Sequence, residues 1–512
     1  MKKRLLSVLL CAVMLASMIP AAFAASDIEN HWAKKYISYL HEQEIYFPKK
    51  NTSTYEPNRQ MTRAEFMRYI NRAFHFTEKA SISYTDVKPT AWYYETVQIA
   101  AKYGYINGVG NNKMDPDGTL TREQAAVIIG RLLKADPGTV SPYELKFTDK
   151  SQISKWSAGY IKAAVDKGIL AGYKDGSFKP GRVVTRGEVA KILYYYLGTP
   201  LSVAGKTYTG ADLKTDTENV TISEGCTLSN ATVKGDLYIT EGVGAAAVTL
   251  NNVKVEGAII VSGGTVLLND TTSDRMIVSS PMNRLLDVTA VGATQIARTE
   301  VASAATLSEK TLNAGSSGLT AVTAGGKSRV SFTLDAEVAE LLLSGEATVS
   351  TTASTVVETL TAAKAASVTG YGTILQADIK AAGVSFAKSV SVASYTLAPG
   401  ISATIGGQTV DTSSSSGVSP DRIDIDLGKL SSLNGSVAVT LPAGVRAEKV
   451  ACDGKTLSLS SEYTESSTGV RLLISYLRTL DRGSHTLILT LSDGTQAGVI
   501  ITVTDSSAAT SA

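Results

Sequence analysis

Three arginines occupy the same place in a short motif that recurs in the N-terminal part of the chain. The motif is Thr-Arg-x-Glu or Thr-Arg-x-Gln, and it stands at residues 62–65, 121–124 and 185–188. Its threonine and its Glu or Gln are spaced to form a capping box, which satisfies free backbone donors at a helix start. Capping does not explain the arginine, because a cation is unfavourable at the positive end of a helix dipole. A helix start beside a guanidinium suits a carboxylate or phosphate, so the motif predicts anion binding by Arg63, Arg122 and Arg186.

Each motif belongs to a longer repeat between Ser26 and Pro200. Every copy begins with an aspartate and a tryptophan, and apolar or small residues follow the tryptophan at offsets of four, five and eight. That spacing is typical of one face of a helix. A turn rich in Gly, Asn, Asp and Pro comes next, clearest at 172–180, and the motif then begins a second helix. The repeat predicts three all-α modules, at residues 26–82, 83–144 and 145–200.

Three features together carry a family resemblance: the aspartate before the tryptophan, the Gly-Tyr-x-Asp-Gly-x-Phe-x-Pro turn and the Thr-Arg-x-Glu helix start. Each copy resembles an S-layer homology (SLH) domain. The resemblance implies a pseudo-threefold bundle whose grooves bind the terminal pyruvylated sugar of a secondary cell-wall polysaccharide. It also implies that the motif arginine contacts the pyruvate carboxylate, which makes Arg63, Arg122 and Arg186 the polysaccharide-binding residues.

The remaining motif residues are expected to shape these grooves, and we expect the tryptophans to lie in the core and not to stack on sugar. The first copy has residues 46–50 in place of the glycine-rich turn, and the second copy ends its motif in Gln124. We therefore expect the groove of the third copy to be the most competent. The motif and groove-shaping residues are Thr62, Glu65, Thr121, Gln124, Thr185, Glu188, Asp27, Asp86, Asp149, Trp32, Trp92 and Trp156.

The first residues are typical of an export signal. A basic start at 1–4 precedes an apolar run at 5–19 and the Ala22-Phe23-Ala24 cleavage site, so residues 1–25 are predicted to be a signal peptide. The rest of the sequence has no stretch apolar enough to span a bilayer. Residues 506–512 contain no sorting motif, so retention on the wall is expected to be non-covalent. We expect a secreted protein located at the cell wall or S-layer.

Charge and cysteine content set further expectations. The net charge is +2, which gives no general attraction to nucleic acid. Cys11 lies in the signal, and Cys226 and Cys452 lie in segments assigned to different domains, so a disulfide between them is not expected.

From 201 to 410 the composition shifts to Val, Thr, Ala, Gly and Ser. The segment 228–242 matches 250–264 at a shift of 22, and later Val338 and Val357 recur at 19. This repeat predicts a right-handed parallel β-helix with Asn230 and Asn252 stacked as an internal ladder. Because the repeats decay between 281 and 331, an irregular or Greek-key β-fold is the alternative.

Some β-helices degrade polysaccharides, and such sites need clustered carboxylates. Here Asp270 and Asp274 are the only tight pair, and a solvated turn explains them better. We therefore predict no catalytic residue, no cofactor and no metal site. The alternative is a wall-tethered carbohydrate-active enzyme or adhesin that uses the β-region. The other aspartates of the region are dispersed, and the histidines suggest no triad: Asp212, Asp216, Asp236 and Asp287; His31, His41, His75 and His485.

Residues 411–420 are typical of a linker, and 507–512 form a tail. Alternating apolar residues in 421–506 predict a small sandwich that resembles the Ig-like modules of bacterial extracellular proteins. The fold class is therefore multidomain, with an all-α bundle followed by mainly β structure. We expect a non-enzymatic surface or S-layer-associated protein with the β-region as stalk or display scaffold. Its expected partners are the wall polysaccharide or a peptidoglycan-linked glycan, and S-layer or neighbouring surface proteins.

Overall fold

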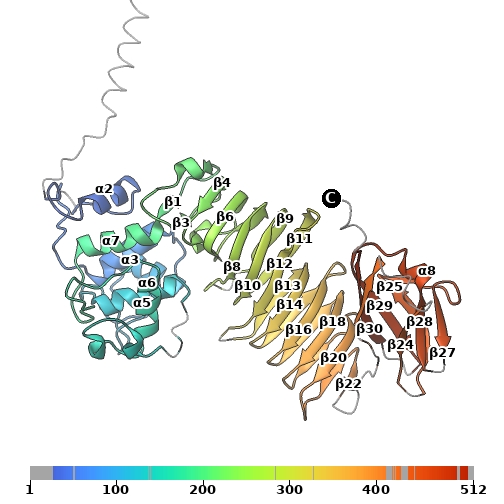
Figure 1. Cartoon of the computed structure of the whole chain (residues 1–512). Coiled ribbons are helices and arrows are strands. Elements are labelled where there is room, and N and C mark those ends of the chain that lie inside the picture. The colour runs from blue at the N-terminus through green and yellow to red at the C-terminus, as the bar shows by residue number, and fades with distance from the viewer. Residues whose placement is uncertain are drawn as a thin grey trace, which may run out of the picture. The chain divides into compact units, whose positions relative to one another are not determined.

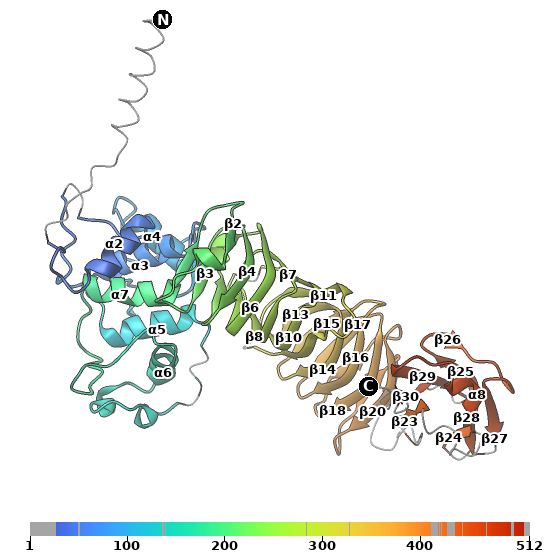
Figure 2. The ribbon, with the colours of Figure 1, turned by 45° about the horizontal axis from the view of Figure 1, so that its top comes forward.

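The computed structural model describes residues 27–505, apart from gaps at 50–51, 136–137, 139, 283, 327, 411–417, 419, 421, 428–435, 443, 467 and 493–495. The predicted signal peptide, most of the predicted linker and the predicted tail lie outside the described residues. The chain forms two compact units (Figures 1 and 2). The first runs to Ser202 and includes Lys214–Ser223, and the second comprises Val203–Leu213 and the chain from Glu224 on.

From residue 27 on, where the structure describes the chain, the first unit contains three pairs of helices, one pair in each predicted module. The second helix of each module packs against the first helix of the next, and the last helix packs against the first, so the three modules close into a ring. The contacting pairs are α3 with α4, α5 with α6, and α7 with α2. The helices are α2 (Lys34–Glu42), α3 (Arg63–Ala73), α4 (Tyr94–Tyr103), α5 (Arg122–Leu132), α6 (Ala158–Asp166) and α7 (Arg186–Leu197).

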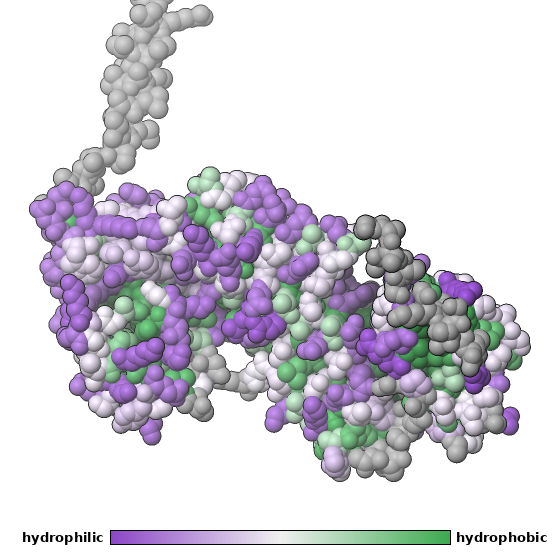
Figure 3. All heavy atoms as spheres, viewed as in Figure 1, coloured by the Kyte–Doolittle hydropathy of each residue, from purple (hydrophilic) through white to green (hydrophobic). Residues whose placement is uncertain are grey.

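Short elements complete this unit. Two 3-10 turns, η1 (Pro142–Glu144) and η2 (Lys150–Gln152), lie between α5 and α6. After α7, strand β1 (Thr199–Leu201) pairs in parallel with β3 (Val220–Ile222), which belongs to the same unit. On the face shown in Figure 3, hydrophilic residues cover much of the helical modules, with hydrophobic residues between them.

The apolar face predicted after each tryptophan is correct at two of its offsets. The residues five and eight positions after the tryptophans have no exposed surface, and they form the core side of the first helix of each module. These residues are Ile37 and Leu40, Val97 and Ala100, and Ile161 and Ala164.

The tryptophans themselves are not core residues, so that expectation is wrong. Trp32, Trp92 and Trp156 are 53%, 53% and 56% exposed. The reason is local: each tryptophan stands two residues before its helix begins, at Lys34, Tyr94 and Ala158. The helical spacing therefore does not extend back to the tryptophan, and its side chain lies at the surface.

The second unit begins with a β-solenoid. Strands β2 (Thr207–Thr209), β4 (Thr227–Val233) and β5 (Leu237–Ile239) lead into the long β6 (Ala247–Val261), with 3-10 turns η3 (Gly210–Asp212) and η4 (Glu241–Val243) between them. From β6 on, each turn of the chain adds one strand to each of two parallel sheets. Burial alternates along strands such as β13 and β15, so every second side chain points into the solenoid.

One sheet of the solenoid runs through β7 (Thr265–Asn269), β9 (Leu286–Gly292), β11 (Ala305–Leu312), β13 (Val330–Asp335), β15 (Ala347–Thr351), β17 (Ala366–Gly370), β19 (Val384–Phe386) and β21 (Ala403–Ile405). The other runs through β8 (Thr272–Val278), β10 (Gln295–Val301), β12 (Gly318–Ala324), β14 (Glu337–Leu343), β16 (Val356–Ala362), β18 (Thr373–Ile379) and β20 (Ser391–Leu397). The antiparallel β22 (Gln408–Val410) pairs with β21.

The register of the solenoid confirms the sequence repeats. Leu228 pairs with Leu250, and Val338 pairs with Val357. The region where the repeats decay keeps the same parallel pairing, as β9 with β11 and β10 with β12 show. The solenoid prediction is therefore confirmed, and the Greek-key alternative is wrong. Its right-handedness stays a prediction.

The asparagine ladder forms, but on the outside. Asn252 Nδ2 donates to Asn230 Oδ1 at 2.8 Å, and both side chains are exposed. Both residues adopt the left-handed conformation, with φ of 49° at Asn230 and 54° at Asn252. Asparagine tolerates this conformation better than most residues. The expectation of an internal ladder is wrong, because both side chains are exposed at the surface of the solenoid.

The C-terminal part consists of two sheets that share one apolar core. The core includes four residues with no exposed surface: Val450, Leu472, Leu487 and Ile501. A short helix, α8 (Ile474–Leu477), contributes Leu477 to it. The five-stranded sheet has the order β23 (Arg422–Asp426), β30 (Gln496–Thr504), β29 (Gly483–Leu491), β25 (Ala447–Cys452) and β26 (Lys455–Thr456), and the three-stranded sheet has the order β24 (Ser436–Thr440), β28 (Gly469–Leu473) and β27 (Tyr463–Ser466).

Two further observations concern the described part of the chain. Cys226 and Cys452 are both buried free thiols. Across the described ranges, the helices are too short or too polar for a membrane span.

Candidate functional site

The three motif helices begin in the same way. In each, the threonine hydroxyl accepts from the backbone N–H three residues on, at 3.2 Å for Thr62 and Thr121 and 3.3 Å for Thr185. The Glu or Gln side chain accepts from the threonine N–H in return, at 3.1, 3.0 and 2.9 Å. The predicted capping boxes are therefore present in all three modules.

The first two backbone donors of each motif helix are already used. Arg63 N donates to Gly118 O at 2.9 Å, and the next residue donates to Pro116 O at 2.9 Å. Arg122 N and Arg186 N donate in the same way to Arg182 O and Arg59 O, both at 2.9 Å. Because a carbonyl of the adjoining module satisfies each donor, the helix start does not offer its backbone to an anion. This part of the predicted anion site is wrong.

The arginine side chains also reach into the adjoining module. We call these contacts the first junction (Arg63 with the second module), the second junction (Arg122 with the third module) and the third junction (Arg186 with the first module). In each junction Nε and Nη2 donate to two backbone carbonyls. The acceptors are Met114 O (2.9 Å) and Asn107 O (2.8 Å) for Arg63, Phe178 O (2.9 Å) and Ala171 O (2.9 Å) for Arg122, and Tyr55 O (2.7 Å) and Phe47 O (3.1 Å) for Arg186.

These bonds hold the modules together. The Nε bonds are buried, whereas the Nη2 bonds are partly exposed, so the guanidinium turns its Nη edge toward the surface. The three arginines are only 4%, 5% and 3% exposed as residues. Their first role is therefore structural, since hydrogen bonds from a charged donor to carbonyls stabilise by about 1.5–3 kcal/mol each.

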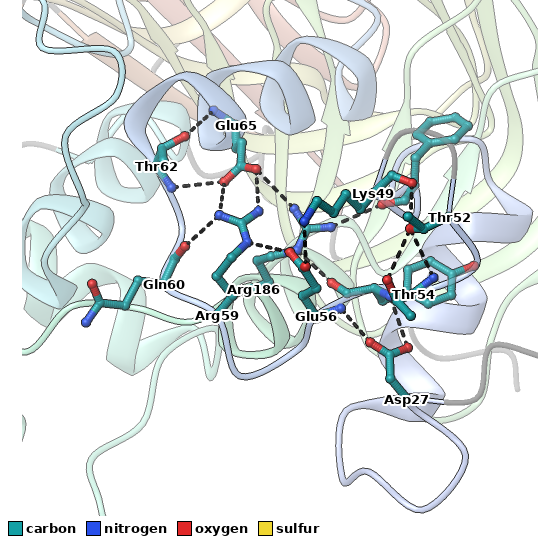
Figure 4. Close-up of polar contacts among 12 residues, drawn as sticks. Asp27, Lys49, Thr52, Thr54, Glu56, Arg59, Gln60, Thr62, Glu65 and Arg186 are labelled. Atoms are coloured by element: carbon teal, nitrogen blue, oxygen red, sulfur yellow. Dashed lines mark hydrogen bonds and ion pairs between the residues drawn. The ribbon is translucent and has the colours of Figure 1, made fainter.

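The motif aspartates position the carbonyl that each arginine contacts. Asp27 accepts from the N–H groups of Tyr55 and Glu56 at 3.0 and 2.7 Å (Figure 4). Asp86 and Asp149 bind the equivalent pairs of N–H groups in their own modules, at 2.9 and 2.7 Å and at 2.8 and 2.7 Å. Each aspartate thus fixes the turn whose carbonyl receives Nε of the arginine from the preceding module in the ring.

At the third junction a carboxylate faces the arginine (Figure 4). Arg186 Nη1 lies 3.4 Å from Glu65 Oε1, and Arg59 binds the same carboxylate with both of its Nη atoms, at 2.5 and 3.2 Å. Burial would raise the pKa of Glu65, but the bonds from Arg59 and from Thr62 N–H hold that pKa below its usual range. The carboxylate is therefore charged and neutralises part of this junction.

At the second junction aromatic rings cover the arginine. The Arg122 guanidinium lies 4.6 Å from the centre of the Tyr173 ring and 4.9 Å from that of Phe178. Glu188 accepts from Tyr173 Oη at 3.0 Å and from Arg182 Nη1 at 2.5 Å. Burial lowers the pKa of Arg122, and Glu188 acts on it only through space.

The first junction lacks both features. The positions that hold Arg59 and Glu65 in the first module hold Gly118 and Gln124 in the second. Within the described residues, Arg63 has neither an ion pair nor a cation–π contact. Burial lowers its pKa, and Asp115 and Asp86 oppose that shift through space.

Sequence reasoning missed Arg59 and Arg182 as members of the site. Each stands four residues before its motif arginine, in a Pro-x-Arg segment that is Pro-x-Gly in the second module. The same module has Gln in place of Glu at the end of its motif. The second module lacks both the arginine and the glutamate. This joint absence is the sequence signal that could have indicated an ion pair between the two positions.

The carboxylates weighed for catalysis in the β-region do not converge. Asp270 Oδ1 accepts from Ala293 N at 2.7 Å, while Asp274 pairs with Arg298. No group of three potential metal ligands occurs in the part of the chain that the structure describes.

Comparison with known proteins identifies the modules. The family model of the S-layer homology domain matches the chain at residues 26–67, 83–126 and 146–190, so the chain carries three SLH domains. SLH domains anchor proteins to the cell wall by binding cell-wall polymers, and the expected location at the cell surface is thereby confirmed.

Several curated proteins share this region. The chain is 32% identical over 176 residues to exoglucanase XynX of Acetivibrio thermocellus, a match covering 33% of this chain and 16% of that protein. It is 25% identical over 189 residues to the surface-layer 125 kDa protein of Lysinibacillus sphaericus, covering 35% and 16%. It is 32% identical over 117 residues to a cellulosome-anchoring protein of Acetivibrio thermocellus, covering 23% and 25%. The chain thus spans a quarter or less of these relatives.

Proposed function

We propose that this chain uses its three SLH domains to hold a secreted surface or S-layer-associated protein on the cell wall without covalent linkage. The ligand is the acidic, pyruvylated end of a secondary cell-wall polysaccharide, and its carboxylate binds the motif arginines. The solenoid serves as stalk or display scaffold, and the protein is not an enzyme. The two C-terminal sheets form an Ig-like sandwich that extends this scaffold toward S-layer or neighbouring surface proteins.

One observation carries the proposal. Arg63 and Arg122 each use Nε and Nη2 to hold the adjoining module, and Nη1 of each has no hydrogen-bond partner within the described residues. A guanidinium whose Nε and Nη2 are already held by hydrogen bonds is preorganised. Binding of an anion at Nη1 therefore costs little of the arginine's side-chain entropy. The same arginine thereby links assembly of the bundle to binding of the wall polymer.

The ring of modules adds a second element. Sites with separate arginines on one rigid bundle can bind several chain ends of the same wall mesh. Linked sites of modest affinity then give strong retention, since each further contact is intramolecular.

The test alters the wall and uses the wild-type protein. A variant without a motif arginine would also lose a contact between modules, so weaker binding could then result from misfolding. The full chain is sedimented with purified wall sacculi, with sacculi stripped of the secondary polymer, and with sacculi treated in mild acid to remove pyruvate. Binding to the untreated sacculi that is lost in both treated samples supports the proposal. Equal binding to the acid-treated sacculi contradicts recognition of the carboxylate.

The non-enzymatic assignment has its own test. The full chain and an Asp270→Asn, Asp274→Asn double variant are incubated with wall glycan, and released reducing ends are measured. Release by the wild type that the double variant lacks would show that the solenoid is catalytic.

A further inference from the structure

We infer that the first junction is the principal carboxylate-binding site of the bundle, and that Glu65 blocks the equivalent site at the third junction. This inference rests on the proposed function, because it assigns the acidic sugar to one of three related positions. The three junctions share the same two bonds from arginine to backbone carbonyls, so their difference lies in what faces Nη1.

At the third junction an internal carboxylate already occupies the place of a ligand. Glu65 Oε1 lies 3.4 Å from Arg186 Nη1, and Arg59 and the N–H of Thr62 hold that side chain in position (Figure 4). An acidic sugar would have to displace Glu65 or bind beside its negative charge. Like charges brought together in this way weaken binding strongly.

At the second junction the carboxylate stands further back. Glu188 is tied to Tyr173 Oη and Arg182 and does not contact Arg122. The Tyr173 ring covers one side of the Arg122 guanidinium, and the nearby charge of Glu188 still opposes an anion. This junction is partly open, with a lower affinity than the first.

At the first junction both obstacles are missing. Gln124 keeps the capping bonds of the glutamates without their charge, since its Oε1 accepts from Thr121 N at 3.0 Å. Gly118 stands where the other two modules have Arg59 and Arg182, so the second module has no arginine at this position that would pair with a carboxylate. The charged arginine Arg63 therefore has no counterion in contact, although Met114 O and Asn107 O hold it in place.

Two aspartates near the first junction place negative charge close to Arg63. Both oxygens of Asp86 accept backbone N–H bonds, from Met114 and Asp115, so this carboxylate is committed to the turn. The Asp115 carboxylate fills the space that a side chain at Gly118 would take. It acts on Arg63 through space without forming an ion pair, and its effect on the pKa of Arg63 is larger than that of Asp86. Asp115 is therefore the nearby carboxylate whose charge weakens anion binding most at this junction.

The experiment exchanges the charges of the first and third junctions. Gln124→Glu gives the second module the glutamate that the other two modules carry at this position. Glu65→Gln gives the first module the glutamine of the second. Both changes keep the capping box, so the helices are expected to fold, which thermal unfolding of each full-length variant verifies. Binding of a pyruvate-ketal hexosamine is measured by calorimetry, with its methyl ester as the uncharged probe and Glu188→Gln as the matched variant at the second junction.

We expect Gln124→Glu to weaken the tightest site by at least about tenfold. Glu65→Gln should add a further binding site to the measured stoichiometry, and Asp115→Asn should tighten binding. If Gln124→Glu leaves the tightest site unchanged while the acid binds and the ester does not, the first junction is not the principal site, and the proposed function stands. If the acid and the ester bind equally, or neither binds, the proposed function itself is contradicted.

Discussion

Arg186 Nε donates a hydrogen bond of 2.7 Å to the backbone carbonyl of Tyr55, and this bond joins the last SLH domain to the first. The two residues are 131 positions apart in sequence. The equivalent bonds from Arg63 and Arg122 join the other two pairs of domains. The motif arginine is therefore a structural contact between domains, and this explains why it stands at a helix start that does not favour a cation.

Replacing Arg186 with alanine should destabilise the helical unit. The change leaves the carbonyls of Tyr55 and Phe47 without a donor, and we expect a loss of about 2–4 kcal/mol in the free energy of unfolding. Urea unfolding followed by far-UV circular dichroism measures it. Arg59→Ala is the control, because its ion pairs are partly exposed and should contribute about 1 kcal/mol or less. Equal effects of the two changes would contradict the structural role of Arg186.

Acid should weaken the same unit. Burial would raise the pKa of Asp86, but backbone N–H bonds from Met114 and Asp115 hold that pKa below its usual range. A carboxylate with a lowered pKa in the folded state stabilises above its unfolded pKa, and that stabilisation is lost as pH falls through the folded pKa. The unfolding midpoint should therefore fall in acid, and Asp86→Asn should flatten this dependence. An unchanged pH profile in that variant would show that Asp86 does not contribute.

His485 should have the opposite dependence in the C-terminal part. Its ring lies between Asp453 Oδ2 at 2.7 Å and Asp481 O at 2.8 Å. Burial would lower the pKa of His485, but these two acceptors raise it above its usual value. The stabilisation is full below the unfolded pKa and is lost as pH rises through the folded pKa. An NMR titration of the ring should show the raised pKa, and Asp453→Asn should return it toward the ordinary value.

The outer asparagine ladder predicts a test of the solenoid. Asn252 has a φ of 54°, which a β-branched residue adopts poorly. Asn252→Val should cost about 1–2 kcal/mol, whereas Asn252→Gly should cost less, because glycine adopts this conformation freely. Thermal unfolding compares the two variants. A valine variant as stable as the glycine variant would show that the backbone there does not constrain the residue.

The features that depend on local spacing could be predicted from the sequence. The capping boxes at Thr62, Thr121 and Thr185 follow from residues three positions apart. The solenoid register follows from repeats such as Val338 and Val357, because each turn contacts only the turns beside it.

The features that depend on distant partners could not be predicted. The acceptors of Arg63 and Arg186 lie 51 and 131 positions away and are backbone carbonyls, which leave no mark on residue types. The surface position of Trp32 depends on where the helix begins, and helix starts are the least certain part of a periodic pattern. The side chain of Asn230 faces outward because of its φ of 49°, which composition does not reveal.

The closure of α7 against α2 also sets an order of events during export. A chain that crosses the membrane N-terminus first delivers Tyr55 long before Arg186, so its first domain emerges without the neighbour that completes it. Contacts between such distant residues form late in folding. The ring therefore closes only once the whole trio of domains is outside, whereas the first junction can assemble as soon as the second domain has emerged.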